Sequence, residues 1–226
     1  MHLEVLAAVL LPFLGTTLGA GFVFLLKGNM NRTLQRILTG FAAGVMVAAS
    51  VWSLIIPAMD QAAHMGKLAF IPALVGVWGG FAFLLALDHL IPHLHLNSDC
   101  PEGMSCGLGK STMMVLAVAL HNLPEGMAAG VGFGNDDVHA ALTVAVGIAL
   151  QNIPEGMVII GPMLAAGVRP RRTFVLAMLT GLVEVVGTLL GYFAVRVASA
   201  ILPFALAFAG GTMLYVISDE MIPETH

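Results

Sequence analysis

Two copies of a polar motif, each inside an apolar segment, carry the side chains best suited to chemistry. The segment ALHNLPEGM recurs as ALQNIPEGM thirty residues further on. Residues four positions apart share one face of an α-helix, so His121 would stack with Glu125 and Gln151 with Glu155. Imidazole, carboxylate and carboxamide groups without a thiolate are a ligand set that divalent transition metals accept. The repeat therefore predicts a metal site built from two helices.

Each copy of the motif also contains an asparagine, a proline and a glycine. The asparagine adds a side-chain oxygen on the same side of the helix. Proline lacks an N–H and clashes with the carbonyl four residues back, so both helices are expected to bend and to free backbone oxygens. Glycine next to the glutamate allows another backbone to approach closely. These residues are Asn122, Pro124 and Gly126 in the first copy, and Asn152, Pro154 and Gly156 in the second.

Seven apolar segments, two of which contain the motif, are each long enough to cross a bilayer. The 226 residues are 58% hydrophobic and 10% charged, with a mean hydropathy of +0.95, which excludes an ordinary soluble domain. About 20 apolar residues span the hydrocarbon core. The predicted helices are 3–26, 33–56, 69–92, 111–133, 138–166, 173–197 and 200–222. We therefore predict an all-α polytopic bundle, with a single transmembrane domain at 1–226 and a first helix that is retained rather than cleaved.

The distribution of basic residues predicts the orientation, because cytoplasmic loops retain Lys and Arg. Seven of the nine fall on one side: Lys27, Arg32, Arg36, Lys110, Arg169, Arg171 and Arg172; Lys67 and Arg196 fall on the other. We expect a plasma (inner) membrane protein with its N-terminus outside. The loop at about 93–110 would then be cytoplasmic, where Cys100 and Cys106 would stay reduced. It would be either a weak metal-capture loop or a flexible polar linker.

A third acidic residue, Glu184, lies near the centre of the sixth predicted helix. A charge at that depth costs about 2.5 to 3.5 kcal/mol on insertion scales. No Lys or Arg lies at this depth to offset Glu125, Glu155 and Glu184, so either they are protonated or a cation neutralises them. We favour a bound metal ion; a proton-coupled carrier or channel that uses the same acids as a relay is the alternative. A membrane hydrolase is disfavoured because the sequence contains no H-E-x-x-H motif.

The motifs HNLPEG and QNIPEG resemble the signatures of the ZIP (Zrt/Irt-like protein) family of divalent metal transporters. The stretches FAAGVMVAASVWSL, GLVEVVG and GGTMLYVISDEMIPETH look like those of its bacterial branch, so the resemblance covers essentially the whole chain. It implies transport of zinc first, and also of iron, manganese, cobalt or cadmium, into the cytoplasm. It further implies a homodimer in the lipid bilayer whose helix bundle moves past a fixed scaffold, with no enzymatic activity, no cofactor besides the transported ion and no nucleic-acid partner.

The resemblance also assigns three groups of residues. A site for one or two ions would lie between the fourth, fifth and sixth helices, with Glu125 and Glu155 bridging the ions. Its ligands would be His121, Asn122, Glu125, Gln151, Asn152, Glu155 and Glu184. The entrance would be lined by Ser53 and Asp60. The exit site would comprise Asp88, His93, His95, Asp219 and Glu220, with His89 beside it.

This sequence departs from the family at three positions. Many relatives have histidine where Gln151 stands, and a carboxamide is a weaker ligand, so the metal preference does not follow directly. Some relatives have aspartate where Asn152 stands, which predicts a weaker or absent second ion site. The given sequence ends at Pro223 to His226, where the family normally enters an eighth helix, so we expect a final segment to be missing.

Overall fold

The computed structural model describes residues 3–25, 31–94, 101–104, 107–134, 138–197 and 199–225. Over this part of the chain the fold is helical, and the only β pairing is an isolated bridge between His93 and Glu102. Seven helical spans are long and apolar enough to cross a membrane. They are Glu4–Phe24, Arg32–Gln61, Phe70–Leu90, Lys110–Val131, Val138–Ala165, Pro170–Val197 and Leu202–Glu224. The predicted all-α class and the seven spans are confirmed.

The spans consist of α-helices continued in places by short segments of other helix types. The α-helices are α1 Leu3–Gly21, α2 Arg32–Ala48, α3 Ile56–Gln61, α4 Phe70–Leu90, α5 Lys110–Val131, α6 Val138–Val158, α7 Ile160–Ala165, α8 Pro170–Val197, α9 Leu202–Val216 and α10 Ile222–Glu224. Two π-helical segments, Ala49–Ile55 and Ile217–Met221, join α2 to α3 and α9 to α10. The 3₁₀ turns are Phe22–Phe24, Ala63–Leu68, Gly132–Gly134 and Ser199–Ile201.

Prolines explain where the observed boundaries differ from the predicted ones. The second span ends at Gln61 rather than at 56, because Pro57 occupies the first turn of α3, where a missing N–H is tolerated. The π segment before it accommodates the extra residue in the helix. Pro170 likewise begins α8, so the two arginines that follow it lie in the first helical turn and not in the predicted loop.

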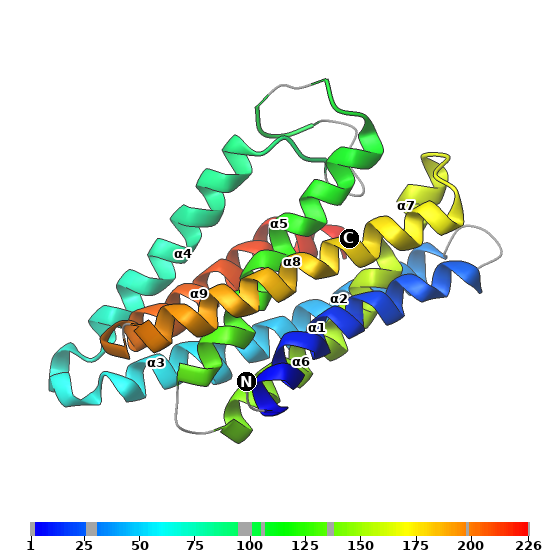
Figure 1. Cartoon of the computed structure of the whole chain (residues 1–226). Helices are drawn as coiled ribbons and strands as arrows, with labels where there is room; N and C mark the ends of the chain where they lie inside the picture. Colours follow the sequence, from blue (N-terminus) through cyan, green and yellow to red (C-terminus); the bar gives the residue numbers. More distant parts are fainter. Residues whose placement is uncertain are drawn as a thin grey trace.

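Two groups of helices pack through small residues. Helices α1, α5, α6 and α8 form a four-helix bundle, in which α5 packs mainly against α8 and α6 against α1 (Figure 1). Helices α3 and α4 and the π segment Ala49–Ile55 pack around α9, whereas α2 packs mainly against α6. We call α2, α3, α4 and α9 the scaffold group, because α2 continues through that π segment into α3. A Cβ atom at Gly80 of α4 would lie 2.4 Å from a backbone oxygen of α9, and one at Gly15 of α1 would lie 2.3 Å from one of α6. Small residues thus allow close approach within each group.

Helices α5 and α6, which carry the two motifs, contact each other much less than they contact α8 and α1. A short connection usually makes two consecutive helices close antiparallel neighbours. Through their glycine faces, α5 packs closely against α8 and α6 against α1. The motif side chains His121, Glu125 and Glu155 project into the space between α5 and α6. The cavity described below is lined from both helices.

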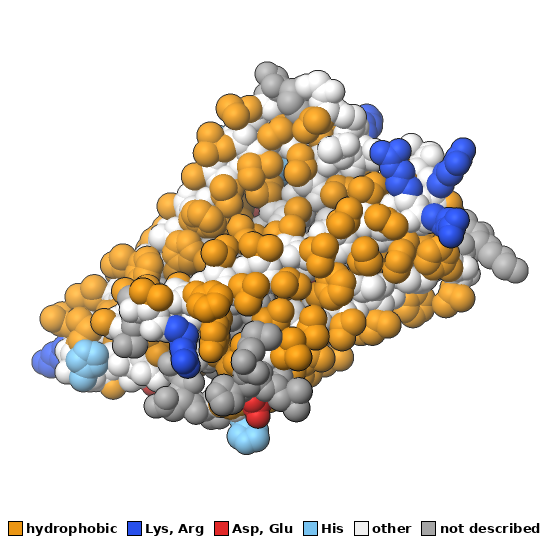
Figure 2. Space-filling model, viewed as in Figure 1, with side chains coloured by type: hydrophobic (Ala, Val, Ile, Leu, Met, Phe, Trp, Pro, Cys, Tyr) orange, Lys and Arg blue, Asp and Glu red, His pale blue; other side chains and the backbone are white. Residues whose placement is uncertain are grey.

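An apolar surface covers the long sides of the molecule. Figure 2 shows hydrophobic side chains over the flank, with a group of Lys and Arg at the end where α7 leads into α8. Large apolar residues such as Trp52 and Trp78 are about two-thirds exposed, at 67% and 68%. Such a surface fits a protein that is solvated by lipid hydrocarbon.

Candidate metal centre

The glycine in each motif brings a second helix against the neighbouring glutamate. A Cβ atom at Gly126 would lie 2.1 Å from the backbone oxygen of Glu184 on α8. One at Gly156 would lie 2.5 Å from the backbone oxygen of Thr16 on α1. The predicted close approach of other backbones at these glycines is therefore confirmed. It places Glu125 next to α8 and Glu155 next to α1.

We expect Gly126→Ala to lower the midpoint of thermal unfolding of the detergent-solubilised protein. The added methyl group would overlap the α8 backbone, and overpacking of this kind costs about 1 to 3 kcal/mol. Gly147→Ala on α6 is the matched control, because no other atom lies within 4 Å of its Cβ position. Equal midpoints for both variants would show that the contact between α5 and α8 at Gly126 is absent.

A cavity lies between the two motifs and the last span. Its walls come from α2, α5, α6, α9, the π segment Ile217–Met221 and α10. The lining residues are Thr39, Ala42, Val118, His121, Glu125, Glu155, Val158, Val216, Glu220, Met221 and Glu224. This lining contains four carboxylates and one imidazole but no Lys or Arg. The cavity is therefore negatively charged when its glutamates are ionised.

The central side chains contain buried polar atoms that nothing in the described chain satisfies. Glu125 is fully surrounded and lies close enough to Glu155, Glu184 and Glu220 for their charges to interact. No hydrogen-bond partner reaches Oε2 of Glu125, Oε2 of Glu155, Oε1 of Gln151 or either amide atom of Asn122. Leaving such groups unpaired in a dry interior is unfavourable. A coordinated cation would satisfy the oxygen atoms and offset the negative charge.

His121 connects the four-helix bundle to the last span. Its Nδ1 atom lies 2.5 Å from Oε2 of Glu220 in the π segment Ile217–Met221. Single π turns inside helices are frequent at functional sites. The family resemblance placed Glu220 in the exit site with Asp88 and His93. Its contact with His121 also places it in the wall of the central cavity, beside a predicted metal ligand.

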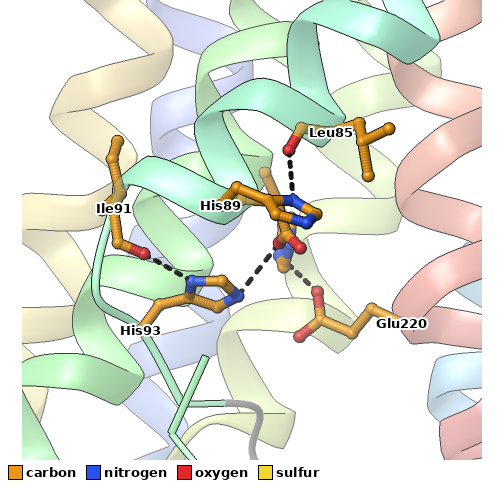
Figure 3. A network of polar contacts seen from close by, with 7 residues as sticks. Leu85, His89, Ile91, His93 and Glu220 are labelled. Atoms are coloured by element: carbon orange, nitrogen blue, oxygen red, sulfur yellow. Dashed lines mark hydrogen bonds and ion pairs between the residues drawn. The ribbon is translucent and has the colours of Figure 1, made fainter. Parts of the chain in front are cut away.

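A second group of ligand-type side chains lies where α4 ends. His93 Nε2 lies 3.0 Å from Oδ1 of Asp88, and each of Asp88, His93 and Glu102 offers a ligand atom within 4.8 Å of the other two. Glu102 is the third member of this cluster. Figure 3 shows the rings of His89 and His93, which contact the backbone oxygens of Leu85 and Ile91 through Nδ1 at 2.9 and 2.8 Å.

Glu102 reaches this cluster because the following turn folds back onto the end of α4. The backbone N–H of His93 donates to the carbonyl of Glu102 at 3.1 Å, and the N–H of Glu102 donates to that of His93 at 2.9 Å. Gly103 has a φ of 77° and a Cβ position only 2.2 Å from the backbone oxygen of Ile91. Only glycine fits this turn without strain.

The remaining predicted residues lie outside the cavity lining and outside the cluster of Asp88, His93 and Glu102. Asp219 is exposed to solvent, unlike the adjacent Glu220. Ser53 is half-buried in the π segment Ala49–Ile55, and Asp60 is exposed at the end of α3; neither lines the cavity. His95, Cys100 and Cys106 lie outside the described residues.

Glu184, Gln151 and Asn152 form a hydrogen-bonded network with α1. Oε1 of Glu184 accepts a hydrogen bond from Oγ1 of Thr16 at 2.5 Å, and Oε2 accepts one from Nδ2 of Asn152 at 2.8 Å. Nδ2 of Asn152 also donates to the backbone oxygen of Pro12 at 3.2 Å, and Oδ1 accepts from Nε2 of Gln151. Hydrogen bonds therefore link the predicted ligands Gln151, Asn152 and Glu184 to one another.

Sequence reasoning missed Thr16 and Glu224. Thr16 lies in the small-residue stretch GTTLGAG, a pattern that indicates close helix packing and not a metal site. Glu224 lies near the end of the chain, one turn after Glu220, and that spacing on one helix face was the available signal.

Comparisons with known proteins agree with these features. A family model described as ZIP zinc transporter matches residues 104–226. The chain is 42% identical to "Zinc transporter GufA" of Myxococcus xanthus, over 98% of this chain and 88% of that protein. It is 36% identical to "Zinc transporter ZIPB" of Bordetella bronchiseptica, over 95% and 70% of the two chains, and 34% identical to "Zinc transporter ZIP11" of Homo sapiens, over 92% and 85%.

Proposed function

Because the chain belongs to the ZIP family of metal transporters, we propose that it carries zinc across a membrane through the centre between α5, α6 and α8. Its relatives are named zinc transporters, and the family consists of transporters rather than enzymes. The observation that carries the site assignment is the set of buried, unpartnered oxygens on both motifs beside a cavity lined by acids. Iron, manganese, cobalt and cadmium ions suit the same ligands and are further candidate substrates.

We assign His121, Glu125, Gln151, Glu155 and Glu184 as ligands of the transported ion. A second ion would be bridged by Glu125 and Glu155 and bound by Asn122 and Asn152. The unpartnered amide of Asn122 supports this second position. Oδ1 of Asn152 already accepts a hydrogen bond from Gln151, which leaves it one lone pair for an ion.

The position of the cavity supports transport toward the cytoplasm. The lining residues of α2, α6 and the last span come from the halves nearest the end that carries Arg32, Lys110 and Arg171, and those of α5 lie around the middle of that helix. Basic residues of this kind are typical of the cytoplasmic side. The cavity would then face the cytoplasm, with the N-terminus, Ser53 and Asp60 toward the outside.

We further propose that the ion leaves by way of Glu220. This carboxylate already contacts His121, so it is the first acceptor that an ion released by the imidazole would meet. The cluster of Asp88, His93 and Glu102 would bind the ion next, at the cytoplasmic end of α4.

The closest packing joins α5 to α8, α6 to α1 and α4 to α9, whereas α2 with α6 and α5 with α9 make smaller contacts between the two groups. This difference supports a mechanism in which one group moves past the other. The metal ligands lie on the bundle, whereas Glu220 lies on the last span, which packs with the scaffold group. A homodimer and a location in the plasma (inner) membrane follow from the family resemblance and stay predictions. The span Phe70–Leu90, only 22% buried, offers the most free surface for a second copy or for lipid.

Uptake by proteoliposomes tests this function. Vesicles containing the purified protein and a zinc-sensitive dye should show saturable accumulation of external zinc, and empty vesicles should not. Collapse of an imposed pH gradient should leave this uptake intact. Proton flux without zinc flux would favour the proton-relay alternative, and no zinc accumulation above that of empty vesicles would contradict the proposal.

A further inference from the structure

The hydroxyl of Thr16 makes an unusual contact for a threonine inside a helix. Such hydroxyls usually donate to the backbone carbonyl four residues back. Thr188 does so, with Oγ1 2.8 Å from the backbone oxygen of Glu184. In Thr16 the corresponding distance, to the backbone oxygen of Pro12, is 3.5 Å, whereas the Glu184 carboxylate lies at 2.5 Å. The Thr16 hydroxyl therefore bonds mainly to the Glu184 carboxylate on α8.

The packing of α1 fixes Thr16 in this position. Gly156 of α6 lies against its backbone oxygen, and Gly181 of α8 lies against its side chain, with a Cβ position 3.3 Å from Cβ of Thr16. Thr16 is 2% exposed and Glu184 is 0% exposed, so water does not compete for the hydrogen bond. Helix α1 carries none of the assigned metal ligands, yet it contacts all three helices that do, α6 and α8 most closely.

Thr16 and Asn152 together bind both oxygens of the Glu184 carboxylate. Thr16 donates to Oε1 and Asn152 donates to Oε2, so the plane of the carboxylate is fixed. Each oxygen retains a further lone pair, because an ionised carboxylate has about four acceptor positions. The two hydrogen bonds thus orient the group without occupying all of its capacity for a metal ion.

We propose that Thr16 is a positioning residue of the metal centre, which orients Glu184 for coordination through its hydroxyl group. This inference rests on the proposed function, because it takes Glu184 to be a ligand. Groups that hydrogen-bond to metal ligands fix their orientation, and loss of one typically reduces metal affinity about 10- to 100-fold. Thr16 acts through Glu184 and does not touch the ion itself.

The test compares three single variants of the full chain. Thr16→Val removes the hydroxyl and retains the shape, Thr16→Ser retains the hydroxyl, and Thr188→Val removes a buried hydroxyl that bonds only to backbone. We expect Thr16→Val to raise the KM for zinc uptake and the zinc Kd of the purified protein about 10- to 100-fold, with a smaller change in maximal rate. Thr16→Ser and Thr188→Val should stay close to the unsubstituted protein. Thr16→Ala serves in place of Thr16→Val if the latter does not fold.

Unchanged zinc affinity in Thr16→Val or Thr16→Ala would overturn the inference. Equal losses in Thr16→Ser and Thr16→Val would also overturn it, since packing alone would then explain the effect. Glu184→Gln separates this inference from the proposed function. If Glu184→Gln weakens zinc binding and Thr16→Val does not, only the role of Thr16 fails. If Glu184→Gln binds zinc normally, the ligand assignment of Glu184 fails as well.

Discussion

Replacing Glu125 or Glu155 with glutamine is expected to abolish saturable zinc uptake by proteoliposomes. Glutamine keeps the size of the side chain but removes the negative charge and one strong ligand oxygen. Both glutamates line the cavity and have a buried oxygen without a partner, so no other group in the described chain replaces the loss. Loss of an outer hydrogen-bond partner alone reduces metal affinity about 10- to 100-fold, and loss of a direct ligand should reduce uptake at least as much.

Glu4→Gln is the matched control for these two substitutions. Glu4 is exposed in the first turn of α1, far from the cavity lining, and its replacement should leave uptake unchanged. Gel filtration should give the same elution volume for all three variants, which would exclude misfolding as the cause. Normal uptake in both Glu125→Gln and Glu155→Gln would contradict a transport site at the two motifs.

His121→Ala is expected to reduce zinc uptake by at least about 100-fold, because loss of an outer hydrogen-bond partner alone costs about 10- to 100-fold and His121 is assigned as a direct ligand. His121 supplies the imidazole in the described cavity lining, and it is the residue that contacts Glu220. The substitution therefore removes a ligand of the centre together with its link to the proposed exit. Initial rates of zinc uptake at several zinc concentrations measure the effect.

His139→Ala provides the comparison for His121→Ala. His139 is exposed at the start of α6 and is not part of the cavity lining, so its variant should transport zinc like the unsubstituted protein. If His121→Ala retained normal rates, the imidazole would not be a ligand, and the pairing with Glu220 would have no role in transport.

Much of the fold follows from short-range patterns in the sequence. Runs of about 20 apolar residues set the spans, since a helix must cover the hydrocarbon core. The i, i+4 spacing correctly indicated that His121 and Glu125 share a face, since both line the cavity. In the second motif Glu155 lines the cavity, whereas Gln151 does not and bonds to Asn152. The glycine after each glutamate correctly indicated a close backbone contact, which the structure places at Glu184 for Gly126 and at Thr16 for Gly156.

The contacts that the sequence did not reveal are those between segments far apart in the chain. Thr16 and Glu184 are 168 residues apart, and no periodicity connects them. Glu102 joins Asp88 and His93 only because a glycine turn folds back onto α4. The pairing of Glu220 with His121 depends on how the last span lies against the bundle, which helix patterns alone do not determine.

Anomalous scattering from crystals soaked in zinc or cadmium tests the metal centre most directly. We predict a peak at the absorption edge of the metal between α5, α6 and α8, about 2.0 to 2.2 Å from a nitrogen of His121 and from carboxylate oxygens of Glu125 and Glu155. Metal bound only at Asp88, His93 and Glu102, or at neither position, would contradict a transport site in the middle of the membrane.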